Sequence, residues 1–224
     1  TSRDVRRPSV PNRRGTRTPL YTADAALTLW DHQKMALEAW QKSGGKGTLG
    51  MATATGKTMV GLAAAEKLFT LHGSLRVLVL AHSRALLDQW RRETIEKLGF
   101  VGGSNGDYRS PLNYDNRFVV EFDTLQKVYK NPGAYATDLL IVDEVHHGAG
   151  LRFREALEVP CRWKMGLSAT VEGAERGQVL DRYLGKTVYT FTLKEARERG
   201  VVPDFNLYVH KTFLDIAEDV EFRE

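Results

Sequence analysis

Residues 51–58 read Met-Ala-Thr-Ala-Thr-Gly-Lys-Thr, and this stretch decides the fold that we expect. It follows a short run, residues 48–52, with the composition of a buried strand, and it opens a helical pattern from Lys57 to about Leu71. A strand, a tight loop, Gly-Lys-Thr and a helix together form a phosphate site, because loop N–H groups and the helix N-terminus face the anion. Met51 stands where the pattern G-x-x-x-x-G-K-[ST] has glycine. The stretch therefore predicts phosphate binding, with a plain turn as the alternative.

The length and composition predict a globular protein of one large or two small domains. The chain has 224 residues, of which 42% are hydrophobic, enough for a substantial core. No apolar run approaches the roughly 18 residues that a membrane span needs, and the first residues do not resemble a secretion signal. The single cysteine, Cys161, excludes an intramolecular disulfide and suits a reducing compartment. We expect a cytoplasmic or nuclear protein that has no membrane partner.

The positive charge is concentrated at the N-terminus. The first 20 residues hold six arginines and one aspartate, which is a net charge of +5. Because the whole chain has a net charge of +4, the remaining residues carry −1. Prolines accompany these arginines, and residues 1–19 are therefore predicted to be an extended basic arm or linker. Contact with nucleic acid must then come from local patches, from this arm or from a partner domain. We expect one domain at 20–212 and the start of a further connection at 213–224.

Apolar runs alternate with helical patterns along most of the chain. This alternation predicts an α/β fold, a parallel sheet flanked by helices on both faces. The expected strands after the first lie at about 76–81, 118–122, 139–142, 164–167, 187–191 and 205–210. The expected helices, apart from that following residue 57, lie at about 31–42 (capped by Thr28 or Asp31), 84–98, 124–129, 151–157, 178–183 and 193–199.

Polar residues gather where these expected strands end. Parallel sheets bind ligands outside the carboxyl ends of their strands, so residues at those ends are expected to form one site. The residues concerned are Gly56-Lys57-Thr58, Ser83-Arg84, Thr124, Asp143-Glu144 and Ser168-Ala169-Thr170.

Asp143 and Glu144 are the predicted acidic partners of the phosphate loop. A carboxylate at the tip of a neighbouring strand can hold Mg²⁺ opposite the Thr58 hydroxyl, and a second carboxylate can position the attacking water. An ordinary acidic loop start is the alternative. His146 suits a hydrogen-bond relay better than zinc, because adjacent histidines diverge and no third ligand has suitable spacing. The Gln33 amide can both donate to and accept from adenine, with solvent exposure as the alternative.

In content and order, these motifs resemble those of the first RecA-like domain of helicase superfamily 2 motors. The most similar branch includes XPB-type helicases and the motor subunits of restriction enzymes. The resemblance runs from about Leu27 to His210. It covers the glutamine motif at 29–33, motif I at 51–58, motif Ia at 80–86, the DEAH-like motif II at 143–146 and motif III at 168–170.

The resemblance implies ATP and Mg²⁺ as cofactors, double-stranded DNA (or RNA) as partner, and a second RecA-like domain in the same protein. Lys57 would hold the β and γ phosphates, Thr58 and Asp143 the metal, and Glu144 the water. The implied nucleotide contacts are Gln33, Thr53, Ala54, Thr55, Gly56, Lys57, Thr58 and Met59. The implied nucleic-acid contacts are Ser83, Arg84, Gly103, Thr124 and Gln126, and the implied coupling residues are His146, Ser168, Ala169 and Thr170.

Three departures from the family pattern are visible. Ala54 replaces a usual glycine, Trp30 and His32 replace an arginine and a tyrosine, and no Arg-Glu-Asp element follows residues 168–170. We expect residues 1–224 alone to bind ATP but hydrolyse it poorly, because an arginine finger from a second domain is worth about 10³–10⁵ in rate. The alternatives are a non-catalytic nucleic-acid-binding module that uses the basic arm, and a P-loop kinase, in which motif III would have no purpose.

Overall fold

The computed structural model describes residues 27–100, 110–145, 153–169 and 174–204. The strand expected at 205–210 lies outside these ranges, as do Gly103, His146 and Thr170. Within the described part, every helix is too short or too polar to cross a bilayer.

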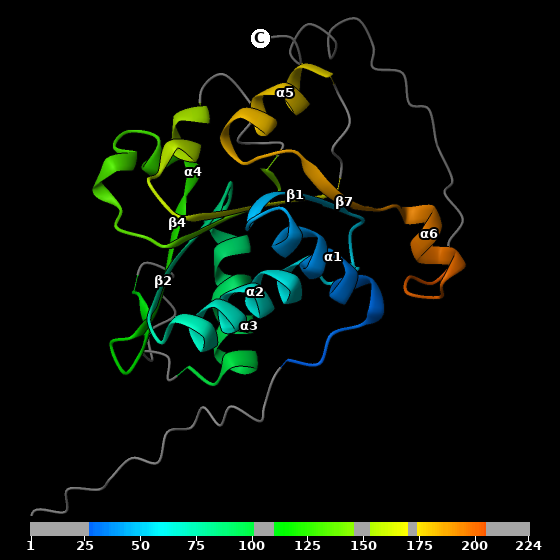
Figure 1. The fold of residues 1–224 in the computed structure, drawn as a ribbon, viewed down its shortest axis with the longest axis horizontal. Coiled ribbons are helices and arrows are strands. Elements are labelled where there is room, and N and C mark those ends of the chain that lie inside the picture. The colour runs from blue at the N-terminus through cyan, green and yellow to red at the C-terminus, as the bar shows by residue number, and fades with distance from the viewer. Residues whose placement is uncertain (1–26, 101–109, 146–152, 170–173, 205–224) are drawn as a thin grey trace, which may run out of the picture.

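A seven-stranded sheet forms the centre of the described domain, in the strand order β3-β4-β2-β5-β6-β1-β7 (Figure 1). Its strands are β1 (Lys46–Met51), β2 (Leu75–Ala81), β3 (Leu112–Tyr114), β4 (Phe118–Thr124), β5 (Leu139–Asp143), β6 (Trp163–Ser168) and β7 (Thr187–Phe191). Neighbouring strands pair in parallel, except that β3 runs antiparallel to β4 at one edge. The expected α/β fold with a mostly parallel sheet is confirmed.

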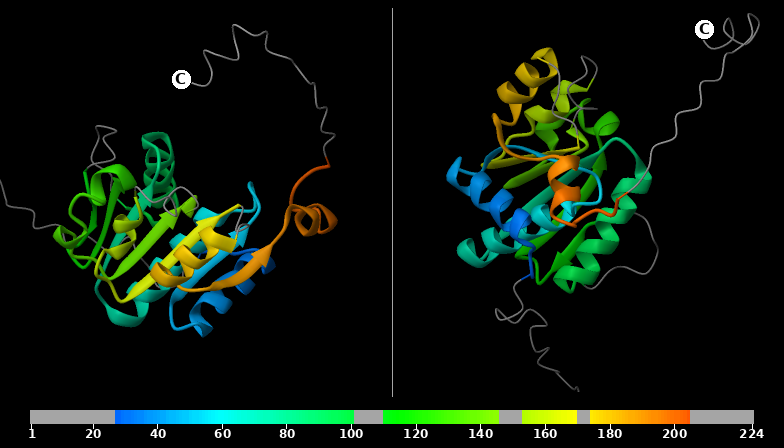
Figure 2. Two further views of the ribbon diagram at one scale, coloured as in Figure 1. Left: turned by 90° about the horizontal axis from the view of Figure 1, so that it is seen from above. Right: turned by 90° about the vertical axis from the view of Figure 1, so that its right-hand side faces the viewer.

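Helices cover both faces of the sheet. They are α1 (Asp31–Lys42), α2 (Lys57–His72), α3 (Arg84–Leu98), α4 (Leu125–Val128), α5 (Ala174–Tyr183) and α6 (Leu193–Glu198), with 3₁₀ turns at Pro132–Ala134 and Arg154–Glu158. Side chains alternate along a strand, so Val77 and Val79 of β2 pack with α1, α2 and α3, whereas Leu78 and Leu80 pack with α4, α5 and the second 3₁₀ turn. Figure 2 shows α6 projecting beyond β7, away from both layers.

Local sequence signals account for the ends of the long helices. The Ser83 hydroxyl accepts a hydrogen bond from the Leu86 N–H (3.4 Å), which caps the start of α3. Gly73 and Gly99 end α2 and α3 in the left-handed region, at φ of 72° and 66°, where a side chain would be strained. These signals fix the start of α3 and the ends of α2 and α3.

Some expectations were wrong in detail. The sheet is mixed, because the short strand β3 pairs antiparallel at the edge, and its three residues give too little alternation to be recognised. The helix expected at 151–157 is a 3₁₀ turn at Arg154–Glu158. The N-cap of α1 is Trp30, in place of Thr28 or Asp31, because the Gln33 side chain accepts a hydrogen bond from the Trp30 N–H and satisfies this end of the helix.

Candidate nucleotide site at the carboxyl edge of the sheet

The carboxyl ends of five parallel strands bring the predicted site residues to one edge. The pairing places Ala81 beside Thr124, Asp143 beside Leu167, and Gly50 beside Ser168. Strand β5 therefore ends in the middle of this edge. The phosphate loop lies on one side of it, and the predicted nucleic-acid contacts on β2 and β4 lie on the other.

The phosphate loop is curved by residues in the left-handed region. Ala54 has φ of 63° and Gly56 has φ of 78°, and the Thr55 hydroxyl donates to the Ala52 carbonyl (2.6 Å) between them. Left-handed residues in a loop turn successive N–H groups towards one concave side, which suits an anion. Thr53 and Ala54 are exposed, whereas Thr58 and Met59 are half-buried in the first turn of α2. The loop and the first turn of α2 thus have a shape that suits a phosphate, although Ala54 is not glycine.

Helix α1 holds this loop from behind. The Gln33 amide nitrogen donates to the Thr55 carbonyl (3.1 Å), and the His32 Nε2 donates to the same oxygen (2.9 Å). Both side chains are buried, and the His32 ring stacks on Phe191 with centroids 4.5 Å apart. Gln33 therefore holds the phosphate loop in place. Recognition of adenine by Gln33 stays a prediction.

Lys57 reaches across β6 to the end of β5. Its Nζ lies 3.3 Å from the Glu144 Oε1 and 3.3 Å from the Met51 carbonyl oxygen. The exposed fractions of the two side chains are only 11% and 21%, so solvent screens this pair less than a surface pair. Glu144 has φ of 46°, an uncommon conformation for a residue with a side chain, and it follows β5 directly. Two residues that the sequence placed in one site are thus in direct contact.

Both carboxylate oxygens of Asp143 accept a hydrogen bond. Oδ2 accepts from the Trp90 indole N–H (2.8 Å), and Oδ1 accepts from the Glu144 backbone N–H (2.9 Å). Burial raises the pKa of the Asp143 carboxyl above its usual value, and the Trp90 bond opposes that rise. Asp143 is therefore a fixed, buried carboxylate at the strand tip, where a metal ligand was predicted.

The predicted nucleic-acid contacts lie on the far side of β5. Ser83 and Thr124 are half-buried, and Arg84 and Gln126 are exposed. The Gln126 amide donates to the His82 carbonyl (3.1 Å), which ties the start of α4 to the turn before α3. The structure thus places four of the five predicted residues near one another, and Gly103 lies outside the described residues.

The predicted coupling residues are placed only in part. Ser168 is fully buried at the end of β6, between β5 and β1, and Ala169 is half-buried. His146 and Thr170 lie outside the described ranges. A role in coupling stays a prediction for all four residues.

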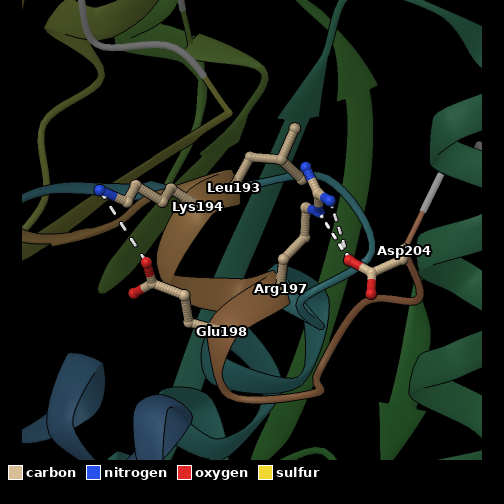
Figure 3. A pocket seen from close by; sticks show the side chains of 5 residues that line it. All are labelled: Leu193, Lys194, Arg197, Glu198 and Asp204. Atoms are coloured by element: carbon tan, nitrogen blue, oxygen red, sulfur yellow. Dashed lines mark hydrogen bonds and ion pairs between the residues drawn. The ribbon is translucent and has the colours of Figure 1, made fainter. Parts of the chain in front are cut away.

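A hollow of about 570 Å³ lies elsewhere, on α6, and contains none of the predicted site residues (Figure 3). Its lining is Leu193, Lys194, Arg197, Glu198 and Asp204. The charged groups pair with one another across the surface, Arg197 with Asp204 (2.9 Å) and Lys194 with Glu198 (3.9 Å). We therefore base the candidate site on the chemistry of the phosphate loop.

The residues at the phosphate loop fit a nucleoside triphosphate with Mg²⁺. Helix α2 has 16 residues, and its first N–H groups have no partner within the helix, so its N-terminus favours an anion. Lys57 supplies a cation, while Thr58 and Asp143 supply the oxygen donors that Mg²⁺ prefers. Phosphate oxygens would compete with Glu144 for the Lys57 ammonium. This competition would weaken the ion pair between Lys57 and Glu144.

The sequence did not reveal two residues of this site. Trp90 lies in the helix predicted at 84–98 but was assigned no role in the site, and His32 was noted only as a departure from the glutamine motif. Their contacts with Asp143 and Thr55 join residues 53 and 23 positions apart in sequence. The one available signal was that both residues carry a ring N–H, which needs a partner when it is buried.

Comparison with known proteins found similarity to restriction enzymes and helicases. Residues 26–173 match the model of the family described as type III restriction enzyme, res subunit. The endonuclease subunit of the type I restriction enzyme EcoAI of Escherichia coli is 28% identical over 182 residues, which are 76% of this chain and 22% of that protein. The DNA 3'-5' helicase XPB of Mycobacterium tuberculosis is 24% identical over 214 residues, 90% of this chain and 37% of that protein. The chain spans well under half the length of either relative.

Solved structures with a similar fold include an ATP-dependent restriction-modification enzyme of type ISP, LlaBIII, bound to DNA. Its TM-score is 0.62 at 21% identity, over 79% of this chain and 16% of that one. At this identity the similarity concerns the fold. It agrees with a RecA-like ATPase core.

Proposed function

Because the chain belongs to the family of the res subunit of type III restriction enzymes, and is related to XPB helicases, we propose that it is the ATP-binding half of a nucleic-acid-dependent motor. The proposed ATP-binding domain would cover residues 20–212. The observation that carries the proposal is the contact between the Lys57 Nζ and the Glu144 Oε1 (3.3 Å), which joins the phosphate loop to the acidic end of β5. A domain that used this edge only for packing would not need a half-buried ion pair beside a left-handed phosphate loop.

In the proposed reaction, each residue has one task. Lys57 binds the β and γ phosphate oxygens, and the α2 N-terminus orients them. Thr58 and Asp143 would hold Mg²⁺, which when bound neutralises phosphate charge. Glu144 orients the attacking water and accepts its proton as the terminal phosphate is released. Gln33 and His32 keep the loop in shape while the phosphates bind and leave.

Double-stranded DNA is the proposed partner, held along Ser83, Arg84, Thr124 and Gln126. The basic arm, residues 1–19, would add electrostatic affinity. Contacts of this kind reach the backbone, so binding should weaken steeply with salt and show little sequence preference. We propose a role for this motor in restriction or in DNA repair.

We also propose that hydrolysis needs a second RecA-like domain. An arginine finger stabilises the charge of the transferred phosphoryl group, and its loss costs about 10³–10⁵ in rate. Residues 1–224 alone should therefore bind ATP and hydrolyse it slowly. Brisk ATPase activity of this chain, stimulated by DNA, would contradict this part of the proposal.

Lys57→Ala tests the phosphate site. Binding of labelled ATP, measured by equilibrium dialysis with Mg²⁺, should be lost while the thermal midpoint stays close to that of the unchanged chain. Lys67→Ala is the matched control, because Lys67 is on the same helix but is exposed, and its Nζ donates to the Gln41 Oε1 (3.0 Å). Unchanged ATP affinity in Lys57→Ala would show that the phosphate loop is assigned wrongly.

Deletion of residues 1–19 separates the motor from a nucleic-acid-binding module. The shortened chain should keep its ATP affinity, and its DNA affinity should fall by the contribution of the arm. Loss of ATP binding on deletion would contradict the proposed nucleotide site, because none of its residues belongs to the arm.

A further inference from the structure

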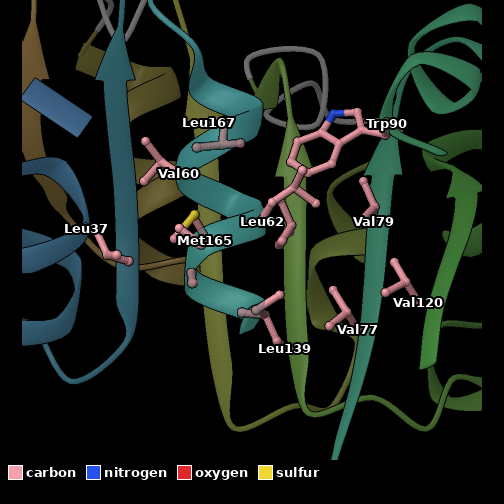
Figure 4. Packing of buried hydrophobic residues seen from close by; sticks show 14 of the residues in the cluster. Leu37, Val60, Leu62, Val77, Val79, Trp90, Val120, Leu139, Met165 and Leu167 are labelled. Carbon is pink, nitrogen blue, oxygen red and sulfur yellow. The ribbon is translucent and has the colours of Figure 1, made fainter. Parts of the chain in front are cut away.

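The ring of Trp90 is buried between the phosphate-loop helix and the end of β5. Trp90 lies on α3 and is 1% exposed, and Figure 4 shows its ring among the packed side chains of this face of the sheet. Its indole N–H donates to the Asp143 Oδ2 at 2.8 Å. A bond of this length to a charged acceptor is a strong one, and its geometry fixes the side chain of Asp143.

The opposite edge of the ring contacts α2. A Cβ added at Gly61 would lie 2.7 Å from the Trp90 Cη2, so the helix backbone approaches the ring as closely as glycine allows. Gly61 lies one turn after Lys57 and Thr58 in α2. A single rigid side chain thus spans from the helix that begins with the phosphate site to the carboxylate at the tip of β5.

We propose that Trp90 is a positioning residue for the metal site, an inference that rests on the proposed function. Trp90 holds the Asp143 carboxylate in one orientation and at one distance from the first turn of α2, where Thr58 lies. Trp90 acts through Asp143, and it need not touch nucleotide or metal. Partners of this kind, one shell away from a metal, typically change metal affinity by about 10–100-fold when they are removed.

Core packing alone is the competing explanation, and the chain contains a matched control for it. Trp40 on α1 is also 1% exposed, and its indole N–H donates to the Lys164 backbone carbonyl at 2.9 Å. Trp40 therefore has the same burial and the same type of donor, but its acceptor lies at the start of β6, opposite the carboxyl edge. Replacement of either residue by phenylalanine removes the same atoms.

The experiment compares Trp90→Phe with Trp40→Phe in the full 224-residue chain. Equilibrium dialysis of labelled ATP is run without metal and over a Mg²⁺ titration. In Trp90→Phe the Mg²⁺ concentration for half-maximal enhancement of ATP binding should rise by about 10-fold or more, and metal-free affinity should stay within about two-fold. Both quantities should stay within about two-fold in Trp40→Phe. Equal Mg²⁺ requirements in the two variants would overturn the proposal.

A second measurement does not require Trp90→Phe to fold. In the unchanged chain labelled with ¹⁵N-tryptophan, one indole N–H resonance should shift when Mg²⁺ and ATP are added. Asp143→Ala, which removes the acceptor, should move the same resonance. A Trp90 resonance that is insensitive to Mg²⁺ and ATP would overturn the positioning role. If the unchanged chain binds no ATP, the proposed function itself fails and this inference fails with it.

Discussion

Gly61→Ala should destabilise the domain, although alanine is the better helix former. Gly61 lies inside α2, where its replacement by alanine ordinarily stabilises a helix by about 1 kcal/mol. Here the new methyl would lie 2.7 Å from the Cη2 and 3.3 Å from the Cζ3 of Trp90, and 3.4 Å from the Cδ1 of Ile141. The Trp90 ring is buried, and it cannot move away without lengthening its 2.8 Å bond to Asp143.

The size of the destabilisation by Gly61→Ala follows from two opposing effects. Overpacking of a well-filled core by one methyl costs about 1–3 kcal/mol, against the gain of about 1 kcal/mol in helix propensity. The expected net loss in the free energy of unfolding is therefore about 1 kcal/mol. For a domain of this size, that loss lowers the thermal midpoint by roughly 2–4 °C.

Trp90→Phe should reverse the sign of the Gly61→Ala effect. The Cη2 and Cζ3 atoms belong to the part of the indole that a phenyl ring lacks, so the methyl gains room in this background. Alanine should then stabilise by up to about 1 kcal/mol, which makes the coupling energy of the double-mutant cycle about 2 kcal/mol. Urea unfolding of the unchanged chain, the two single variants and the double variant, followed by circular dichroism, measures the free energies from which the coupling energy is calculated.

A stabilising Gly61→Ala in the unchanged background would refute this reasoning. So would additive effects of the two substitutions, because additivity would mean that the ring and the helix backbone are not in contact. Such a result would also remove one of the two contacts on which the positioning role of Trp90 rests.

Two other substitutions test separate contacts. Tyr135→Phe removes a hydroxyl that donates to the buried Asp123 carboxylate (2.9 Å), and it should lower the free energy of unfolding in urea by about 1 kcal/mol. Burial raises the pKa of the Tyr135 hydroxyl in the folded chain. The difference in stability between the two proteins should therefore shrink above about pH 10, where the unfolded tyrosine ionises first. Gly56→Ala should lower both the ATP affinity and the thermal midpoint more than Gly73→Ala does. The two glycines have similar positive φ angles, 78° and 72°, but only at Gly56 would a methyl group collide with the Gln33 amide. Equal losses in the two glycine variants would argue against a close contact between Gln33 and the phosphate loop.

Much of the sheet was predictable because strands β2, β4 and β5 contain apolar runs between helix signals. β2 and β5 are almost entirely buried, and burial on both faces requires the composition that the sequence shows. Strand β3 was missed because it has three residues and its antiparallel partner follows after a short turn. Local patterns do not show which edge of a sheet accepts such a short strand.

The candidate site was predictable as a set of residues but not as a set of contacts. Asp143, Glu144 and Lys57 could be placed together because parallel strands end at one edge. The hydrogen bond between Trp90 and Asp143 depends on the position of α3 relative to β5. Tertiary packing determines that position, and the local sequence does not. The same holds for Gln33. Recognition of adenine by its amide stays a prediction, whereas the bond from this amide to the Thr55 carbonyl, which holds the loop, was not predicted.

The position of β1 between β6 and β7 has a consequence for synthesis of the chain. β1 carries the phosphate loop, yet both of its neighbours in the sheet are made later, and Phe191 pairs with Met51 from roughly 140 positions further on. At about 5–20 residues per second, the ribosome needs roughly 7–28 s to reach Phe191 from Met51. The loop therefore cannot acquire its final shape until nearly the whole domain has been translated. A ribosome that stalls before β6 leaves the candidate nucleotide site unformed, and it leaves β1, which is mostly buried in the folded domain, exposed to chaperones.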